Sequence, residues 1–422
     1  MNSFDSIIGY EGVKKELYQV IDIFKNKQKY EDMGAKIPRG VLIYGRPGLG
    51  KTMLSEALIN ECGVDAFVIK NNNCEKELIN DINDKFSKAT KLDKAIIFLD
   101  DLDKFSDSDE DSVDDRIFVT VQANIDSVKG KDILVIATVN SLRKLPHSLV
   151  RSGRFDRKLG LDSPSNEDAR KIIEYYLSKK KINPNLNIDD VSKMINYTSC
   201  AELETILNES AIIAAYNNKD SIDIDDIAKA HIKDEYNIGD DKFECSDETA
   251  METALHEAGH AVAAEAIKDG CVGFLTIQAT DTEEMQGFTH ICERFNRRPE
   301  NVVVALAGKA ACELFIRGRC ASGCMKDLTK AVELIKDGLE LNGTYGLSFL
   351  KINDEPIDLT ASKRAAIIQA ELERFMFIAK DILLKNKDFL FKLAEDLKEK
   401  KVIFHSDIKR IKESVNVIHT TV

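Results

Sequence analysis

The sequence of 422 residues predicts an α/β domain with a buried parallel sheet at residues 1–165, a small helical domain at 166–237 and a mainly helical domain at 238–422. Two observations indicate this order. In the first part, short apolar runs alternate with helical patterns, which is typical of a doubly wound α/β domain. A polar stretch at 237–247 then separates two regions of helical periodicity, and we expect it to be a linker.

Four short apolar runs in the first part have the composition of buried parallel strands. They are "GVLIYG" (40–45), "AFVIK" (66–70), "AIIFLD" (95–100) and "ILVIATV" (133–139). In the second part, the patterns "NEDARKIIEYYL" and "AELETILNESAIIAAY" predict helices. The third part is also mostly helical, with strand-like interruptions at 273–279 and 287–292.

The charge balance and the cysteines exclude several classes of protein. The 59 Lys and Arg against 72 Asp and Glu leave a formal net charge of −13, whereas nucleic acid binding requires clustered positive charge. No stretch approaches the roughly twenty apolar residues of a membrane helix, and the start has no secretory signal. Nine scattered cysteines without CxxC spacing indicate a reducing compartment. We therefore expect a cytoplasmic protein with no nucleic acid partner and no transmembrane segment.

The stretch "GRPGLGKT" fits the phosphate-binding pattern GxxxxGK[ST] between a predicted strand and a predicted helix. Its glycines let backbone N–H groups turn toward phosphate oxygens. The lysine supplies a positive charge for the β- and γ-phosphates, and the threonine hydroxyl can bind magnesium. The predicted nucleotide-binding residues of this loop are Gly45, Arg46, Pro47, Gly48, Leu49, Gly50, Lys51 and Thr52.

Polar residues that suit nucleotide hydrolysis follow the later strands. Asp100 ends "IIFLD", where a carboxylate can hold magnesium through water, and Asp101 follows at the position of a water-activating carboxylate. Asn140 ends "VIATVN" and could orient the attacking water. Arg151 and Arg154 in "LVRSGRFDRK" could stabilise charge on the γ-phosphate of a neighbouring subunit, which requires a ring or stack of subunits.

The third part contains "ALHEAGHAV", a match to the HExxH pattern. His256 and His260 are four residues apart, so both imidazoles lie on one helix face and can bind one zinc ion. Glu257 is then positioned as a general base toward water. The alternative is an amphipathic helix with two incidental histidines.

A catalytic zinc takes three protein ligands and leaves a position for water, so a third ligand must come from elsewhere. The candidates are His290 in a strand-like stretch, Glu313 in "ALAGKAACELFI" and Asp327 at the start of "KDLTKAVELIKDGL". Spacing alone does not choose among them.

Nearly the whole chain resembles the soluble part of the FtsH-type ATP-dependent zinc metalloproteases. The stretches that carry the resemblance are "YEDMGAKIPRGVLIYGRPGLGKT", "LVRSGRFDRK", "ALHEAGHAVAAE" and "VVVALAGKAACELFIRG". The resemblance implies an α/β P-loop AAA+ domain with a small helical lid, followed by a mainly α-helical zinc metallopeptidase domain. It also implies a hexameric ring that unfolds proteins with ATP and threads them into a protease chamber.

The same resemblance implies roles for particular residues. In the family, the third zinc ligand is an aspartate that opens a helix after a "GASNDL"-like motif, and "ASGCMKDL" matches it here, which implicates Asp327. The arginine fingers would be Arg151 and Arg154. Cys200–Ala201 stands where the family has a Gly-Ala pair near the nucleotide.

The chain departs from the family pattern at three places. It begins about where the ATPase domain begins, so we expect either a soluble relative or a fragment, and Met1 favours a natural start. Asp101 replaces the family's catalytic glutamate, and one methylene less withdraws the carboxylate by about 1.5 Å. A misplacement of that order costs on the order of a hundredfold in rate. The stretch at 70–82, which matches the substrate-gripping pore loop, has no aromatic residue to hold an extended chain by apolar contact.

The sequence therefore predicts an ATP-dependent zinc endopeptidase that uses zinc, ATP and magnesium and acts on protein or peptide substrates as a homo-oligomeric ring. One alternative is a nucleotide-gated zinc peptidase that cuts only unfolded chains, with weak ATP hydrolysis and little unfolding power. Another is a non-proteolytic remodelling ATPase whose metal site is structural.

Overall fold

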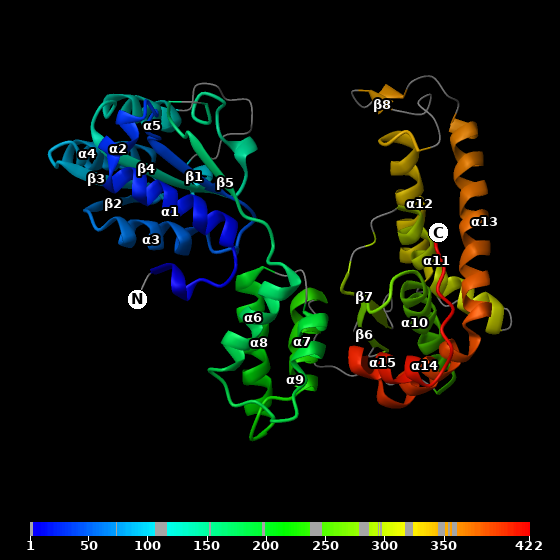
Figure 1. Ribbon diagram of the computed structural model, residues 1–422. Helices are drawn as coiled ribbons and strands as arrows, with labels where there is room; N and C mark the ends of the chain where they lie inside the picture. The colour runs from blue at the N-terminus through cyan, green and yellow to red at the C-terminus, as the bar shows by residue number, and fades with distance from the viewer. Residues whose placement is uncertain are drawn as a thin grey trace. The chain divides into compact units, whose positions relative to one another are not determined.

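The computed structural model divides the chain into two units. Residues 1–176 with 197–205 form the first, and residues 177–196 with 206–422 form the second (Figure 1). Both units therefore hold parts of the helical region predicted at 166–237, and the predicted boundaries of that domain stay a prediction. The structure describes residues 3–72, 74–105, 116–151, 153–195, 199–236, 247–277, 287–293, 295, 298–316, 324–344, 351–352, 355–356 and 361–422.

Of the predicted linker at 237–247, only residue 247 lies within the described residues. Within the described parts of the chain, no helix combines the length and the apolar character that crossing a membrane requires.

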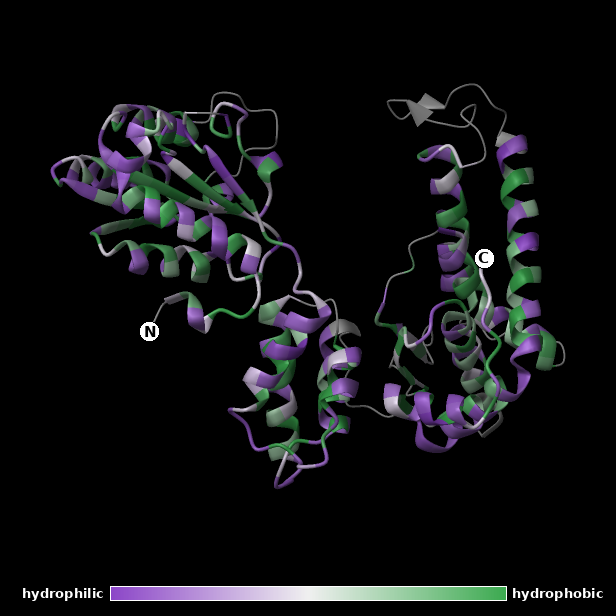
Figure 2. Cartoon of the chain, in the orientation of Figure 1, coloured by the Kyte–Doolittle hydropathy of each residue, from purple (hydrophilic) through white to green (hydrophobic). Residues whose placement is uncertain are grey.

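The first unit is built on a five-stranded sheet in the order β2-β3-β4-β1-β5, and each neighbouring pair is parallel. The four predicted strands are confirmed as β1 to β4, and the short β5 was not predicted because only one of its four side chains is buried. The sheet's interior strands are predominantly hydrophobic in Figure 2. The strands are β1 (Gly40–Tyr44), β2 (Ala66–Ile69), β3 (Lys94–Leu99), β4 (Asp132–Val139) and β5 (Arg157–Gly160).

Helices cover both faces of this sheet. Val41 and Ile43 of β1 pack with side chains of α1 and α3, whereas Leu42 between them packs with side chains of α4 and α5. Alternate side chains of a strand point to opposite faces, so the continuous apolar run fills two cores. The helices are α1 (Glu11–Lys25), α2 (Lys27–Asp32), α3 (Lys51–Cys62), α4 (Glu75–Ala89) and α5 (Arg116–Ser127), with 3₁₀ turns η1 (Ser3–Ser6), η2 (Leu102–Lys104) and η3 (Leu142–Lys144).

Two further helices contain residues of both units. They are α6 (Asn166–Leu177) and α8 (Cys200–Tyr216), and both coincide with helices predicted from the sequence.

The second unit is organised around helix α10 (Asp247–Ile267), whose residues 253–266 are all buried. The helix is rich in alanine, and such small side chains let α11 approach closely. It also contacts α13, α14 and strands β6 and β7. The other helices are α7 (Ile188–Met194), α9 (Ile224–Tyr236), α11 (Arg298–Phe315), α12 (Cys324–Glu340), α13 (Ala361–Lys385), α14 (Lys387–Lys400) and α15 (His405–Glu413).

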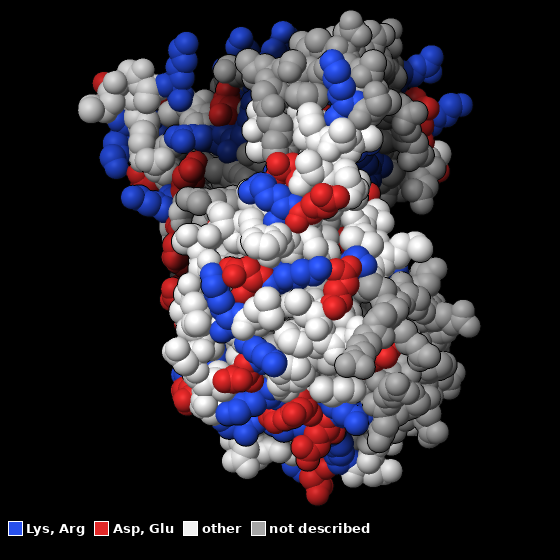
Figure 3. Space-filling view, turned by 90° about the vertical axis from the view of Figure 1, so that its right-hand side faces the viewer, with Lys and Arg blue, Asp and Glu red and all other residues white. Residues whose placement is uncertain are grey.

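A three-stranded antiparallel sheet in the order β10-β6-β7 lies beside α10. Two of its strands, β6 and β7, correspond to the predicted strand-like segments. Positive and negative side chains are interspersed on the face of the molecule shown in Figure 3. The strands are β6 (Val272–Thr276), β7 (Phe288–Ile291) and β10 (Val402–Phe404), and a separate hairpin holds β8 (Lys351–Ile352) and β9 (Glu355–Pro356).

Candidate functional site

The loop at 45–50 connects β1 to α3, which begins at Lys51. Gly48 and Gly50 have φ angles of 76° and 85°, a left-handed conformation that glycine adopts without a steric penalty. The ammonium group of Lys51 donates to the carbonyls of Gly45 (2.8 Å) and Arg46 (2.9 Å) and to Oδ1 of Asn140 (2.8 Å). Burial lowers the pKa of Lys51. The sheet therefore brings the predicted lysine and asparagine together.

Asp100 lies at the carboxyl end of β3, close to the start of α3. Its Oδ1 accepts hydrogen bonds from the hydroxyls of Thr52 (3.0 Å) and Thr138 (2.9 Å), and its Oδ2 lies 3.2 Å from Nζ of Lys70. Because β3, β4 and β1 are neighbouring parallel strands, their carboxyl ends meet at one edge of the sheet. A phosphate loop, a threonine hydroxyl and a carboxylate at one edge can hold a nucleotide and magnesium.

Asp101 is turned toward a lysine of its own loop. Its backbone is left-handed (φ 54°), its N–H donates to Oγ1 of Thr138 (2.7 Å), and its Oδ2 lies 2.8 Å from Nζ of Lys104. In this ion pair the Asp101 carboxylate faces Lys104 and not an attacking water. Nothing in the sequence motif indicated this pairing.

The two predicted arginine fingers differ in their surroundings. Arg151 is exposed. The guanidinium of Arg154 donates to Gln122 (3.0 Å) and the carbonyl of Ser148 (2.5 Å) and forms an ion pair with Asp126 (2.7 Å). Within the described residues, neither arginine contacts the P-loop of its own chain. Their predicted role toward a neighbouring subunit stays a prediction.

The start of α8 lies against the P-loop. The N–H of Ala201 donates to the carbonyl of Gly48 at 3.1 Å. A Cβ atom at Gly48 would come within 2.6 Å of Oγ of Ser199, so glycine is required for this contact as well as for its φ angle.

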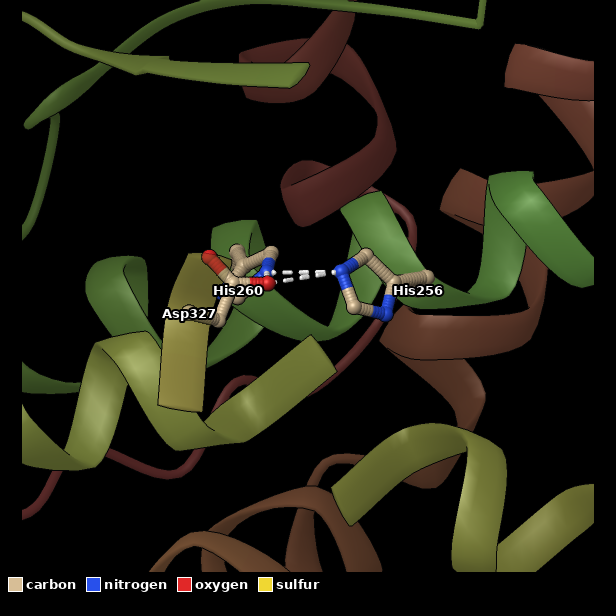
Figure 4. Close-up of side chains that lie close together, drawn as sticks. All are labelled: His256, His260 and Asp327. Atoms are coloured by element: carbon tan, nitrogen blue, oxygen red, sulfur yellow. Dashed lines mark hydrogen bonds and ion pairs between the residues drawn. The ribbon is translucent and has the colours of Figure 1, made fainter. Parts of the chain in front are cut away.

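The second candidate site lies on α10, where His256 and His260 are one helical turn apart. Figure 4 shows both rings turned toward Asp327, which comes from the first turn of α12. The Nε2 atoms of the two histidines are 3.1 Å apart, and Oδ2 of Asp327 lies 3.0 Å from that of His256 and 3.2 Å from that of His260. The three predicted metal ligands therefore converge on one point.

The other two candidates for a third ligand lie elsewhere. His290 is on β7, where its ring stacks on Phe274 at 5.5 Å between centroids. Glu313 on α11 forms ion pairs with Lys309 (2.9 Å) and Lys380 (2.6 Å). Among the described residues, His256, His260 and Asp327 are the one group of at least three side chains that could hold a metal ion.

The donor set fits zinc. Two imidazoles and one carboxylate are its usual ligands, and ligand atoms about 2.0–2.1 Å from a tetrahedral zinc lie roughly 3.3 Å from one another. Burial raises the pKa of Asp327, but hydrogen bonds and charge from the two histidines outweigh it and hold this pKa well below the usual range. Burial lowers the pKa of His260, and Asp327 more than compensates, raising it to about 9. The site therefore favours negative charge on its carboxylate.

Two residues of α11 support this group, and the sequence did not reveal them. The carbonyl of Val304 lies 2.7 Å from Nδ1 of His260, which leaves Nε2 for a metal. A Cβ atom at Gly308 would stand 2.4 Å from Nε2 of His260 and 2.7 Å from Nε2 of His256. Because Gly308 has no side chain, there is room here for the two Nε2 atoms to lie close together.

Glu257 is buried, and burial raises its pKa. Its Oε2 lies 2.8 Å from the hydroxyl of Thr289 on β7. This carboxylate is next in sequence to a metal ligand, and in the low-dielectric interior it is a stronger proton acceptor than an exposed one. A signal for Thr289 was absent from the motif, because it lies 32 residues away.

The chain is similar to one protein family in its first part and to several known proteins over nearly its whole length. Residues 41–163 match the model of the ATPase family associated with various cellular activities (AAA). The ATP-dependent zinc metalloprotease FtsH of Borreliella burgdorferi is 28% identical over 97% of this chain and 69% of its own length. FtsH 2 of a Thermoanaerobacter species is 26% identical over 99% of this chain and 84% of its own length. FtsH 4 of Synechocystis is 28% identical over 100% of this chain and 73% of its own length. The chain thus carries an AAA ATPase domain and, over nearly its whole length, is similar to the FtsH-type ATP-dependent zinc metalloproteases.

Proposed function

We propose that this protein is an ATP-dependent zinc endopeptidase that degrades protein substrates. The observation that carries the proposal is the convergence of His256, His260 and Asp327, with Glu257 beside them, in a chain that also holds a P-loop AAA domain. The names of its relatives support the same activity.

In the nucleotide site, the backbone of the loop at 45–50 and Lys51 would bind the phosphates of ATP. Thr52 would bind magnesium, with Asp100 behind it holding the ion through water. Asn140, which lies at the same edge of the sheet, would orient the attacking water. Asp101 would act as the base, after leaving its ion pair with Lys104.

In the peptidase site, His256, His260 and Asp327 would hold the metal. A bound zinc ion polarises the peptide carbonyl and makes water more acidic. Glu257 would accept a proton from the attacking water at its carboxylate and then deliver it to the leaving nitrogen. The hydroxyl of Thr289 holds that carboxylate in place.

The active form would be a homo-oligomeric ring, most simply a hexamer, in which Arg151 and Arg154 act on the nucleotide of the neighbouring subunit. Arg154 would first leave its partners on α5. We also propose a cytoplasmic location, since none of the seven cysteines recorded in the described residues forms a disulfide.

A second candidate is a peptidase that uses nucleotide only for gating and cuts unfolded chains. Two observations favour it: Asp101 is short and paired with Lys104, and the stretch at 70–82 has no aromatic residue. Both features would weaken ATP-driven unfolding of the substrate and leave the peptidase site unchanged.

The experiment compares degradation of a permanently unfolded protein and a tightly folded one, each with and without ATP. Lys51→Ala removes the phosphate contact, and Glu257→Gln removes the base but keeps the metal ligands. The main proposal requires that wild type degrades both substrates with ATP. It further requires that Lys51→Ala spares the folded substrate and that Glu257→Gln cuts neither.

Resistance of the folded substrate, with continued cleavage of the unfolded one, would support the second candidate. Cleavage of either substrate by Glu257→Gln would refute the assigned base. A wild-type protein that binds ATP but neither binds zinc nor cuts would be a remodelling ATPase.

A further inference from the structure

The second ring nitrogen of His256 faces two cysteines. Its Nδ1 lies 3.8 Å from Sγ of Cys312 on α11 and 3.7 Å from Sγ of Cys324, the first residue of α12. Both thiols are buried and neither is in a disulfide. Within the described residues, these sulfurs are the polar atoms in contact with Nδ1, so the ring has no oxygen acceptor on that side.

A histidine that binds a metal through Nε2 carries its proton on Nδ1, and that N–H needs an acceptor to fix the ring. His260 has the carbonyl of Val304 for this purpose. We propose that Cys312 and Cys324 are positioning residues that accept the Nδ1–H of His256 and so hold its ring for metal binding. This inference rests on the proposed metal centre.

The arrangement of α12 supports this role. Cys324 and Asp327 are three residues apart, so they lie on one face of the first helical turn. Cys324 approaches Nδ1 of His256, and Asp327 approaches its Nε2 at 3.0 Å. One turn of α12 therefore contacts both nitrogens of the same ring, and Cys312 adds a second sulfur from α11.

A buried cysteine can also be a small apolar side chain that fills space. The two roles differ in their response to serine and alanine. Serine keeps a hydrogen-bond acceptor at nearly the same place, whereas alanine removes it. If the thiols only fill space, serine offers no advantage over alanine, because a hydroxyl is costlier to bury than a methyl group.

The test measures the dissociation constant for zinc by competition with a chelating dye, alongside the thermal unfolding temperature without metal. The variants are the double substitutions Cys312→Ala with Cys324→Ala and Cys312→Ser with Cys324→Ser. The matched control is Cys271→Ala, which removes an equally buried thiol from the same unit. We expect the double alanine variant to bind zinc about 10–100-fold more weakly. The double serine variant and the control should stay close to wild type.

Wild-type zinc affinity in the double alanine variant would overturn the inference while leaving the metal centre intact. An equal loss with serine and alanine would also overturn it. Absence of zinc from the wild type would refute the proposed metal centre itself. If the double alanine variant does not fold, the single variants Cys312→Ala and Cys324→Ala decide the question. Their cobalt-substituted absorption spectra should then differ from wild type, and spectra identical to wild type would overturn the inference.

Discussion

The hydroxyl of Thr289 lies 2.8 Å from Oε2 of Glu257 and 2.9 Å from the backbone carbonyl of the same residue. The contact ties strand β7 to helix α10 at the residue we assign as the base. Because the carboxylate is buried and accepts a hydrogen bond from this hydroxyl, its direction is set by the strand as well as by its own helix.

We therefore predict that Thr289→Ala slows peptide cleavage while zinc affinity is retained. Loss of a hydrogen bond to a charged group is worth about 1.5–3 kcal/mol, which corresponds to roughly 10–100-fold in kcat. Thr289→Ser keeps the hydroxyl and should keep most of the activity. Steady-state cleavage of a fluorogenic peptide and zinc titration measure the two effects. Equal kcat values for alanine and serine would show that the hydroxyl does not hold the base.

Gly308 gives the second prediction, which concerns the space in which the ligands meet. A methyl group there would overlap both imidazoles, so Gly308→Ala should abolish stoichiometric zinc binding. Gly259→Ala is the matched control, because its methyl would instead meet the carbonyl of Ala307, 2.7 Å away in the contact between α10 and α11. It should lower the unfolding temperature and leave zinc ligation possible. Zinc content by mass spectrometry after dialysis checks both variants. A full complement of zinc in Gly308→Ala would contradict the geometry.

These supporting residues mark the limit of what the sequence predicts. The residues of the P-loop follow one another in the chain, and His256 and His260 are four residues apart. In each case the spacing in the sequence predicted the geometry. Asp327 is 71 residues from His256, and the resemblance to a family was needed to choose it over His290 and Glu313. Thr289, Val304 and Gly308 are brought to the site only by the packing of β7 and α11 on α10, for which no local pattern exists. No sequence pattern predicted the left-handed turn at Asp101 either, because the backbone conformation there depends on its hydrogen bond to Thr138.

The third prediction concerns the length of Asp101. Asp101→Glu extends the carboxylate by about 1.5 Å, as estimated from a C–C bond length. Hydrolysis should then rise, by up to about a hundredfold if position limits the rate. The affinity for a non-hydrolysable ATP analogue should not change, because phosphate binding depends on Lys51. Lys104→Ala tests the ion pair separately and should have a smaller effect, since a partly exposed pair contributes only about 0.2–1 kcal/mol. Phosphate release assays measure all three proteins. An Asp101→Glu variant no faster than wild type would show that carboxylate length is not limiting.

The fourth prediction concerns acid stability. His231 on α9 and His290 on β7 lie 5.7 Å apart between ring centroids. Burial lowers the pKa of His231 to about 3, with a further contribution from His290, and burial lowers the pKa of His290 to about 4. In the unfolded chain both would titrate near 6.5, so between these values the unfolded state binds more protons. The free energy of unfolding therefore decreases as the pH falls below about 6.5, by about 2 kcal/mol per histidine at pH 5.

His231→Phe keeps a ring in this cluster and removes one of the two titrating groups. The free energy of unfolding, measured with urea at several pH values, should therefore fall less steeply between pH 6.5 and 5 than in wild type. His419→Gln serves as the control, because His419 is exposed and lies outside this cluster. The contact joins α9 to β7, the strand that carries Thr289, within one unit. The free energy of unfolding of His231→Phe could instead depend on pH as steeply as that of wild type. His231 would then be already protonated in the folded protein, or the cluster would open before the unit unfolds. Either result would contradict a neutral buried pair.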